Sequence, residues 1–227
     1  MMERIHEVCP LIVYQGTIDC HKDFKEKNID TLRKYWFNGY SFESPECSGK
    51  IFAHLNEDYS DFFGDLKKNI DGYFNALSVD FNKLSYHVVK TWVGYHGDND
   101  TPSVSPHTHN ESNLSFVYYL KTDETSDKFC VSVQGDNKNE CMRGLFETAE
   151  QFNLITGYNK YNCDVYTITP YEGTVVIFPS NIGHFTQQYT ERADERIVVA
   201  GDVRVTLADS QYMHHQGSTH PSQWKTL

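Results

Sequence analysis

The segment at residues 106–120 reads PHTHNESNLSFVYYL and joins a histidine-rich stretch to a run of aromatic and β-branched residues. Within residues 114–120 two kinds of side chain alternate, which is the period of a β-strand. One set is apolar enough to pack under a helix and consists of Leu114, Phe116, Tyr118 and Leu120. The other set is smaller and more polar and consists of Ser115, Val117 and Tyr119. The segment therefore predicts a strand with a core on one face and either a ligand or water on the other.

The chain around this strand changes character near residue 84. Before that point, residues 19–36 and 62–77 show amphipathic patterns that predict two helices. After it, six segments rich in β-branched and aromatic residues predict strands, at residues 86–95, 114–120, 129–133, 165–169, 174–178 and 196–205. Helices followed by strands without intervening helices favour an α+β, mainly β domain with an antiparallel sandwich or barrel.

Composition and charge exclude several classes of protein. The chain has 227 residues and 39% hydrophobic residues, enough for one domain with a core, and its aliphatic runs are too short to cross a bilayer. The formal charge of −11 argues against a nucleic-acid partner. The six cysteines are scattered without a CxxC pair, and the N-terminal residues lack the apolar stretch of a secretory signal. We therefore expect reduced thiols, a cytoplasmic location and no membrane partner.

His107, His109 and Glu111 lie at alternate positions just before the central strand. On an extended segment alternate side chains point the same way, so two imidazoles and a carboxylate can converge on one face. Such a ligand set suits a first-row transition metal. A solvated polar loop that contains two histidines is the alternative interpretation.

His184 follows the predicted strand at residues 174–178 and a Pro-Ser turn. At this position it is either a further metal ligand or a histidine that hydrogen-bonds within the turn. The long connection at residues 135–162 is polar and exceeds the usual length of a loop in a compact domain, so it is a candidate lid.

Arg196 opens the last predicted strand and shares a face with Val198, Ala200 and Asp202. If that face points inward, the arginine needs an anion, because an unpaired buried charge is costly. Its planar guanidinium matches a carboxylate. If the face points outward, Arg196 is a surface charge beside Glu195.

In their order along the chain, these motifs resemble the iron(II)- and 2-oxoglutarate-dependent oxygenases. The resemblance covers residues 86–206 and consists of Tyr95-His96-Gly97, Pro106-His107-Thr108-His109, Val117-Tyr118-Tyr119-Leu120, Pro170…Gly173…Phe178-Pro179-Ser180…His184 and Arg196. Within that family the chain is most similar to the prolyl-hydroxylase-like branch, close to its uncharacterised bacterial and phage members with an HxH…SxVYYL signature. The resemblance implies a double-stranded β-helix, a jelly-roll or cupin-like barrel, braced by N-terminal helices.

The resemblance also implies one domain over residues 1–227. Residues 1–84 would form a helical support layer. Residues 85–207 would form a double-stranded β-helix core that includes the candidate lid, and residues 208–227 would form a polar tail.

For the site, the resemblance implies one iron ion with His184 as the distal ligand. The usual proximal motif is His-x-Asp or His-x-Glu. Alignment on the Pro-His step puts His109 in the carboxylate position, whereas alignment on the chemistry makes His109-Asn110-Glu111 the His-x-Glu motif. We expect three of His107, His109, Glu111 and His184 to bind the metal directly.

The resemblance further implies a site for 2-oxoglutarate. Arg196 matches the basic residue that pairs with the distal carboxylate of this co-substrate. Tyr119 and Tyr95 match residues whose hydroxyl groups contact it, and Ser115 lies on the same inward face as Tyr119.

The implied activity is hydroxylation of a C–H bond with Fe(II), 2-oxoglutarate and O₂, releasing succinate and CO₂, with ascorbate as a possible reductant. The resemblance favours a protein or peptide side chain as substrate, and the host cytoplasm as location if the protein is phage-encoded. Two alternatives stay open. One is a three-histidine, cupin-type iron dioxygenase that does not use 2-oxoglutarate, and the other is a β-barrel binding module without catalysis.

Overall fold

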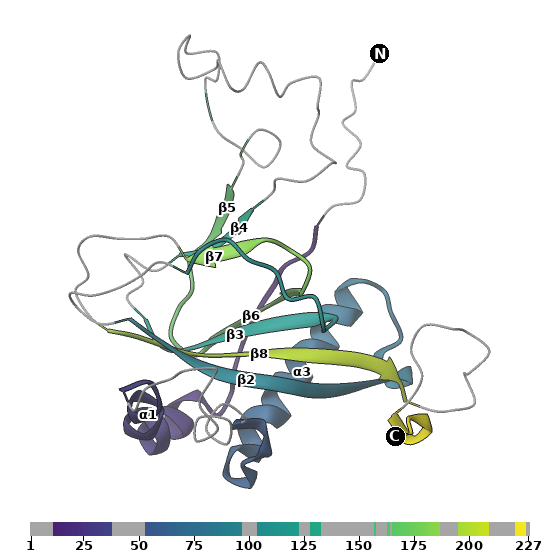
Figure 1. Ribbon diagram of the computed structural model, residues 1–227, viewed down its shortest axis with the longest axis horizontal. Helices are drawn as coiled ribbons and strands as arrows, with labels where there is room; N and C mark the ends of the chain where they lie inside the picture. Colours follow the sequence, from purple (N-terminus) through teal and green to yellow (C-terminus); the bar gives the residue numbers. More distant parts are fainter. Residues whose placement is uncertain are drawn as a thin grey trace.

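The computed structural model places two antiparallel β-sheets face to face, with the helices on the outer side of the larger sheet (Figure 1). The structure describes residues 11–37, 53–96, 104–122, 128–132, 157, 163, 165–186, 195–208 and 221–225. The helices are α1 (His21–Phe37), α3 (Ser60–Ala76) and the 3₁₀ helices η1 (Ala53–Leu55), η2 (Glu57–Tyr59), η3 (Phe81–Lys83) and η5 (Pro221–Gln223). The strands are β1 (Tyr14–Thr17), β2 (Leu84–His96), β3 (Leu114–Lys121), β4 (Phe129–Ser132), β5 (Val165–Ile168), β6 (Thr174–Pro179), β7 (His184–Thr186) and β8 (Arg196–Leu207).

The order of the strands brings distant parts of the sequence together. The larger sheet has the order β1-β6-β3-β8-β2, and the smaller sheet has the order β5-β4-β7. β3 lies between β6 and β8, and its Ser115 is directly opposite Asp202 of β8 and Phe178 of β6. This register decides which side chains can meet on the face that the two sheets share.

A hydrophobic core lies between the helices and the outer face of the larger sheet. α3 has apolar residues at three- and four-residue spacing, and it buries them against the sheet. Phe62 of α3 contacts Tyr118 of β3, with 4.9 Å between the ring centroids. Full burial of such a side chain stabilises the fold by about 1.5–3 kcal/mol. The helices therefore pack against one face of the larger sheet and bury it.

A second hydrophobic core lies between the two sheets. It contains residues from both sheets: Val117, Tyr119, Phe129, Val131, Val176, Phe178, Ile182, Val198 and Ala200. The two faces of β3 thus belong to different cores, because Phe116, Tyr118 and Leu120 belong to the core on the helical side. The space between the sheets is the interior of the barrel.

The predicted fold class, α+β and mainly β, is confirmed. Each predicted helix and strand is present within a few residues of its expected bounds, while β1 and β7, of 4 and 3 residues, are additional. Residues 135–162, apart from Gly157, lie outside the described residues, so the lid stays a prediction, as does the division into a support layer, a core and a tail.

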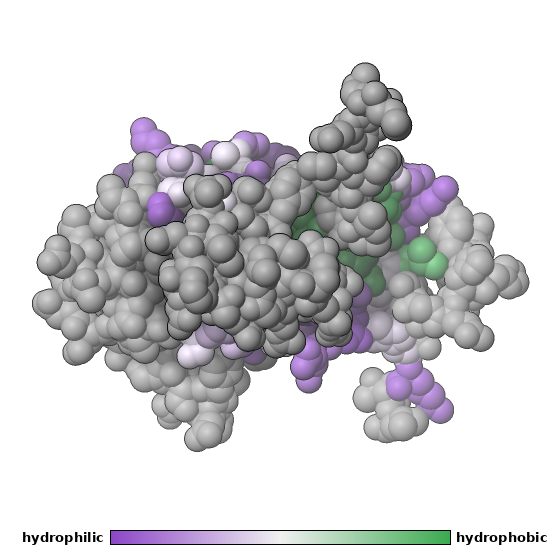
Figure 2. All heavy atoms as spheres, turned by 90° about the horizontal axis from the view of Figure 1, so that it is seen from above, coloured by the Kyte–Doolittle hydropathy of each residue, from purple (hydrophilic) through white to green (hydrophobic). Residues whose placement is uncertain are grey.

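Among the residues that the structure describes, no helix is both long and apolar enough to cross a bilayer. In the view from above, many of the described residues at the surface are hydrophilic and hydrophobic ones show only in a restricted, recessed area (Figure 2).

Candidate metal centre

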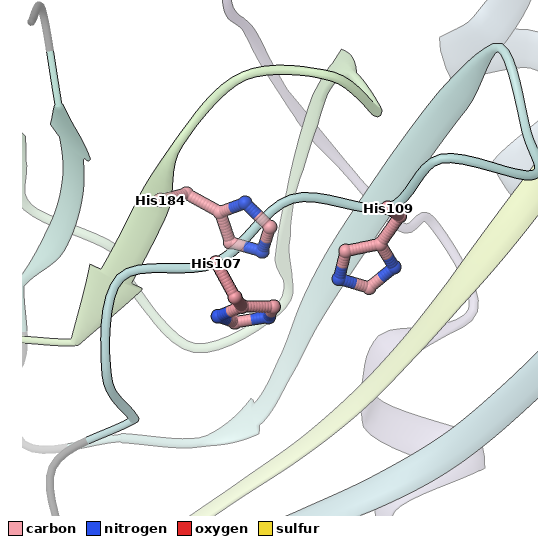
Figure 3. Close-up of side chains that lie close together, drawn as sticks. All are labelled: His107, His109 and His184. Carbon is pink, nitrogen blue, oxygen red and sulfur yellow. The ribbon is translucent and has the colours of Figure 1, made fainter.

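Three histidines converge at one end of the space between the sheets. His107 and His109 come from the segment that precedes β3, and His184 is the first residue of β7 (Figure 3). Each offers a ring nitrogen, and these atoms all lie within 4.8 Å of one another. The ring centroids are 4.3 Å apart for His107 and His184, and 5.1 Å apart for the other two pairs. Three convergent imidazoles are a ligand set for a first-row transition metal.

Backbone hydrogen bonds hold the two segments together. The His107 amide donates to the His184 carbonyl at 3.1 Å, and the His184 amide donates to the His107 carbonyl at 3.0 Å. The His109 amide donates to the carbonyl of Ser180 at 2.7 Å. The positions of the three imidazoles are thus fixed by pairing between chain segments that are far apart in sequence.

The hydrogen bonds of the rings also fix which nitrogen carries the proton. His107 Nδ1 lies 2.8 Å from the carbonyl oxygen of Ser105, and His184 Nδ1 lies 3.0 Å from that of Ile182. His109 Nδ1 lies 2.7 Å from Asp202 Oδ1. Because a carbonyl or carboxylate oxygen only accepts, each neutral ring is protonated at Nδ1 and keeps its lone pair on Nε2.

These tautomers fit a metal ion. His109 Nε2 is buried and has no hydrogen-bond partner among the described residues. An orphaned acceptor of this kind is costly unless a ligand fills its place. Burial also lowers the pKa of His184 to about 4, so this ring is neutral at pH 7, the form that binds a metal.

Behind His109 lies a buried polar network. Ser115 Oγ donates to Asp202 Oδ1 at 2.7 Å and shares a hydrogen bond of 2.9 Å with Ser180 Oγ. Ser112 Oγ is also 2.9 Å from Ser180 Oγ. Burial raises the pKa of Asp202, but the hydrogen bonds from His109 and Ser115 outweigh this effect, and the net shift is downward. Asp202 is therefore ionised at neutral pH.

Sequence reasoning did not assign a role to two residues of this centre. Asp202 was recognised only as a neighbour of Arg196 on one strand face. Trp92 of β2 is half-buried, and its ring stacks on that of His109 at 5.4 Å between centroids and an interplanar angle of 25°. An alternation of faces along β2 could have suggested Trp92, but nothing local in the sequence places it beside His109.

Arg196 and Tyr119 lie together on the inner face of the larger sheet. Arg196 is only 4% exposed, which excludes the interpretation as a surface charge. Its guanidinium carbon lies 5.3 Å from the centroid of the Tyr119 ring, a cation–π distance. Val198 of the core between the sheets is a neighbour of both residues, because it is opposite Tyr119 in the sheet and two positions after Arg196 along β8. A buried guanidinium on this face can recognise a carboxylate.

The structure does not bring Glu111 or Tyr95 into this site. Glu111 is exposed, because the chain bends at residues 110 and 111 and the alternation of faces ends there. Its carbonyl oxygen instead accepts a hydrogen bond from Arg204 Nη2 at 2.6 Å. Tyr95 is half-buried against the core on the helical side of the sheet, the face opposite to Tyr119 and Arg196. The structure thus groups neither Glu111 with the three histidines nor Tyr95 with Tyr119, and the roles expected for these two residues stay predictions.

The comparisons with known proteins point in the same direction as this geometry. Residues 90–202 match the model of a family described as "Putative 2OG-Fe(II) oxygenase". The match contains all three histidines, Asp202 and Arg196. No curated protein of similar sequence was found.

This chain is also similar in fold to several solved structures. The nickel complex of the non-heme monooxygenase ThoJ is 10% identical over 88% of this chain and 76% of its own, with a TM-score of 0.52. HygX from Streptomyces hygroscopicus, with nickel and 2-oxoglutarate bound, is 13% identical over 86% of this chain and 82% of its own, with a TM-score of 0.46. The similarity to ThoJ confirms the double-stranded β-helix.

A shorter match is a 2OG-Fe(II) oxygenase-family oxidoreductase from Burkholderia pseudomallei. It is 15% identical over 60% of this chain, with a TM-score of 0.37. This chain spans about half the length of that oxidoreductase, at 49%.

Proposed function

We propose that this protein is an Fe(II)- and 2-oxoglutarate-dependent dioxygenase that hydroxylates a C–H bond, and that His107, His109 and His184 hold the iron. The observation that carries the proposal is the set of three convergent rings, each with its Nδ1 in a hydrogen bond and its Nε2 left for a metal. The family match supplies the reaction class. Glu111 is left out of the ligand set because it is exposed.

The second part of the proposal concerns the co-substrate. Arg196 would bind the distal carboxylate of 2-oxoglutarate through its planar guanidinium, and the Tyr119 ring beside it would fix the orientation of that group. The apolar residues between the sheets, including Val117 and Val198, would exclude water from this pair. An ion pair is stronger in such a dry environment than at the surface.

The proposed reaction is balanced as R–H + 2-oxoglutarate + O₂ giving R–OH + succinate + CO₂. Bound iron supplies the activation of dioxygen for this chemistry. The chain's own residues position the metal and the co-substrate and keep water away. For the substrate we propose a protein or peptide side chain, because the motifs resemble the prolyl-hydroxylase-like branch and the formal charge of −11 suits a basic partner.

One observation favours a second candidate function. Three imidazoles without a carboxylate ligand are also the set expected for a cupin-type iron dioxygenase that does not use 2-oxoglutarate. The buried Arg196 favours the first candidate, since the alternative chemistry has no need of a carboxylate site.

The deciding experiment measures succinate and CO₂. The full chain is incubated with Fe(II), 2-oxoglutarate and ascorbate under air, and ¹⁴CO₂ from 1-¹⁴C-labelled co-substrate is counted. We expect turnover in the wild type, and its loss in His184→Ala. Oxygen consumption that is independent of 2-oxoglutarate would instead identify the cupin-type reaction. Tight iron binding without either activity would overturn both candidates.

A further inference from the structure

The carboxylate that contacts His109 lies on the Nδ1 side of the ring and not at the metal position beside Nε2. Asp202 is 7% exposed and its Oδ1 accepts two hydrogen bonds of 2.7 Å, one from His109 Nδ1 and one from Ser115 Oγ. His107 and His184 use backbone carbonyls for the equivalent contact. Among the three rings of the described cluster, His109 alone is therefore linked to a negative charge.

This arrangement has a consequence for the charge of the centre. Three neutral imidazoles leave a divalent ion with its full double charge, whereas a triad with one carboxylate ligand reduces it by one unit. A carboxylate that accepts the Nδ1 proton of a ligating histidine raises the basicity of the ring and orients it. We propose that Asp202 is a positioning residue that supplies, through His109, the negative charge that a directly bound carboxylate would otherwise give. This inference rests on the proposed three-histidine ligand set.

The surrounding contacts make Asp202 and His109 one rigid unit. Ser180 uses its carbonyl to accept the His109 amide and its hydroxyl to bind Ser115, which in turn holds Asp202. On the ring itself, Trp92 stacks at 5.4 Å. His109 is thus fixed at its backbone, at its Nδ1 and on its face, and each contact ends at a residue of the larger sheet or of the adjoining turn.

The register of the larger sheet explains why Asp202 can reach this place. Ser115 of β3 and Asp202 of β8 are direct Cα partners, so their side chains lie on the same face and next to each other. Asp202 also lies on the face of Val198 and Ala200, which belong to the core between the sheets. A carboxylate on that face would be costly without partners, and its two hydrogen bonds to protein groups offset this cost.

The test uses the metal alone and needs no turnover. Asp202→Asn keeps an oxygen at Oδ1 but removes the charge, and Co(II) and Ni(II) binding to the full chain is measured by calorimetry. We expect affinity to fall by about 10- to 100-fold, the usual effect of losing the partner of a ligating histidine. The Fe(III)/Fe(II) potential of the iron-loaded protein should rise, because Asp202→Asn removes a negative charge that stabilises the ferric state more than the ferrous state. A merely structural role of Asp202 would not move that potential.

Asp65→Asn is the matched control. Asp65 is equally buried, at 6% exposed, but it binds Lys68 and the amide of Cys20 away from the three histidines. We expect this variant to keep wild-type metal affinity and potential. Asp202→Asn with wild-type affinity and potential would overturn the inference.

A measurement on the wild type covers the case in which Asp202→Asn does not fold. With diamagnetic Zn(II) bound, the Nδ1 proton of His109 should resonate further downfield than those of His107 and His184, because it alone is bonded to a carboxylate. Equal shifts for the three protons would overturn the inference. If the wild type binds metal and shows these signatures but forms no succinate, the proposed function fails while the role of Asp202 stands.

Discussion

Gly201 of β8 is so closely surrounded that replacing it with alanine should destabilise the protein. A Cβ added there would lie 2.6 Å from Cε1 and 2.7 Å from Cζ of Phe116, and 2.7 Å from the carbonyl oxygen of Lys90. Phe116 is fully buried, and the contact atom of Lys90 belongs to the backbone, at the irregularity in β2 between Val88 and Lys90. Neither group can therefore move away easily to make room for a methyl group. Overpacking of this kind costs about 1–3 kcal/mol. Gly201→Ala should therefore lower the free energy of unfolding by that amount.

Gly64→Ala is the matched comparison. Gly64 lies in α3, and a Cβ there would meet nothing within 4 Å. Because alanine costs less backbone entropy than glycine in a helix, this variant should be stabilised by about 0.5–1 kcal/mol. For a chain of this size 1 kcal/mol corresponds to about 2–4 °C in Tm. In calorimetry or denaturant titration, the Tm and the free energy of unfolding should thus change in opposite directions for the two variants. An unchanged or raised Tm for Gly201→Ala would refute the register of β3, β8 and β2 described above.

Three further predictions concern the site. Arg196→Ala should weaken binding of 2-oxoglutarate by about 30- to several-thousand-fold, the cost of about 2–5 kcal/mol for removing one side of a buried charge pair, while Ni(II) binding stays nearly intact. Arg204→Ala, at an exposed position of the same strand, should change little, and the reverse result would reassign the carboxylate site. His184→Ala should lose stoichiometric Mn(II) or Ni(II) binding in calorimetry; full retention of metal would show that the ion binds elsewhere. In the metal-free protein, burial lowers the pKa of His184 from 6.5 to about 4. As the pH drops from 6.5 to 4, the unfolded chain therefore binds a proton at this residue before the folded chain does. The free energy of unfolding falls over this range by up to about 1.4 kcal/mol per pH unit. Urea titrations should show this slope in the wild type and a smaller one in His184→Gln, and equal slopes would contradict it.

Local patterns in the sequence were sufficient for the elements of the fold. α3 repeats its buried residues at three- and four-residue spacing, and β3 alternates between two kinds of side chain, so each periodicity identifies its element. The short strands β1 and β7 were not predicted, because 4 or 3 residues are too few to show a period.

Local patterns failed where the chain bends or where both faces of a strand are apolar. Glu111 follows His109 at the same spacing as His109 follows His107, but the bend at residues 110 and 111 turns its side chain to solvent. Tyr95 belongs to a strand with Trp92 on one face and Val93 on the other. Alternation alone cannot tell which face of such a strand is the interior of the barrel.

The sequence by itself determined that two histidines precede β3 at alternate positions, that Arg196 shares a strand face with Asp202, and that these motifs resemble those of the 2OG-Fe(II) oxygenases. Only the tertiary structure decided that His107 and His109, and not Glu111, join His184, which the resemblance had already implied as a ligand. It also decided that Trp92 stacks on the His109 ring and that Asp202 is the carboxylate partner of this ring. The physical reason is the antiparallel register of the sheets. His109 and Asp202 are 93 residues apart in the chain, and no local pattern encodes a contact that depends on how β3, β8 and the segment before β7 are paired.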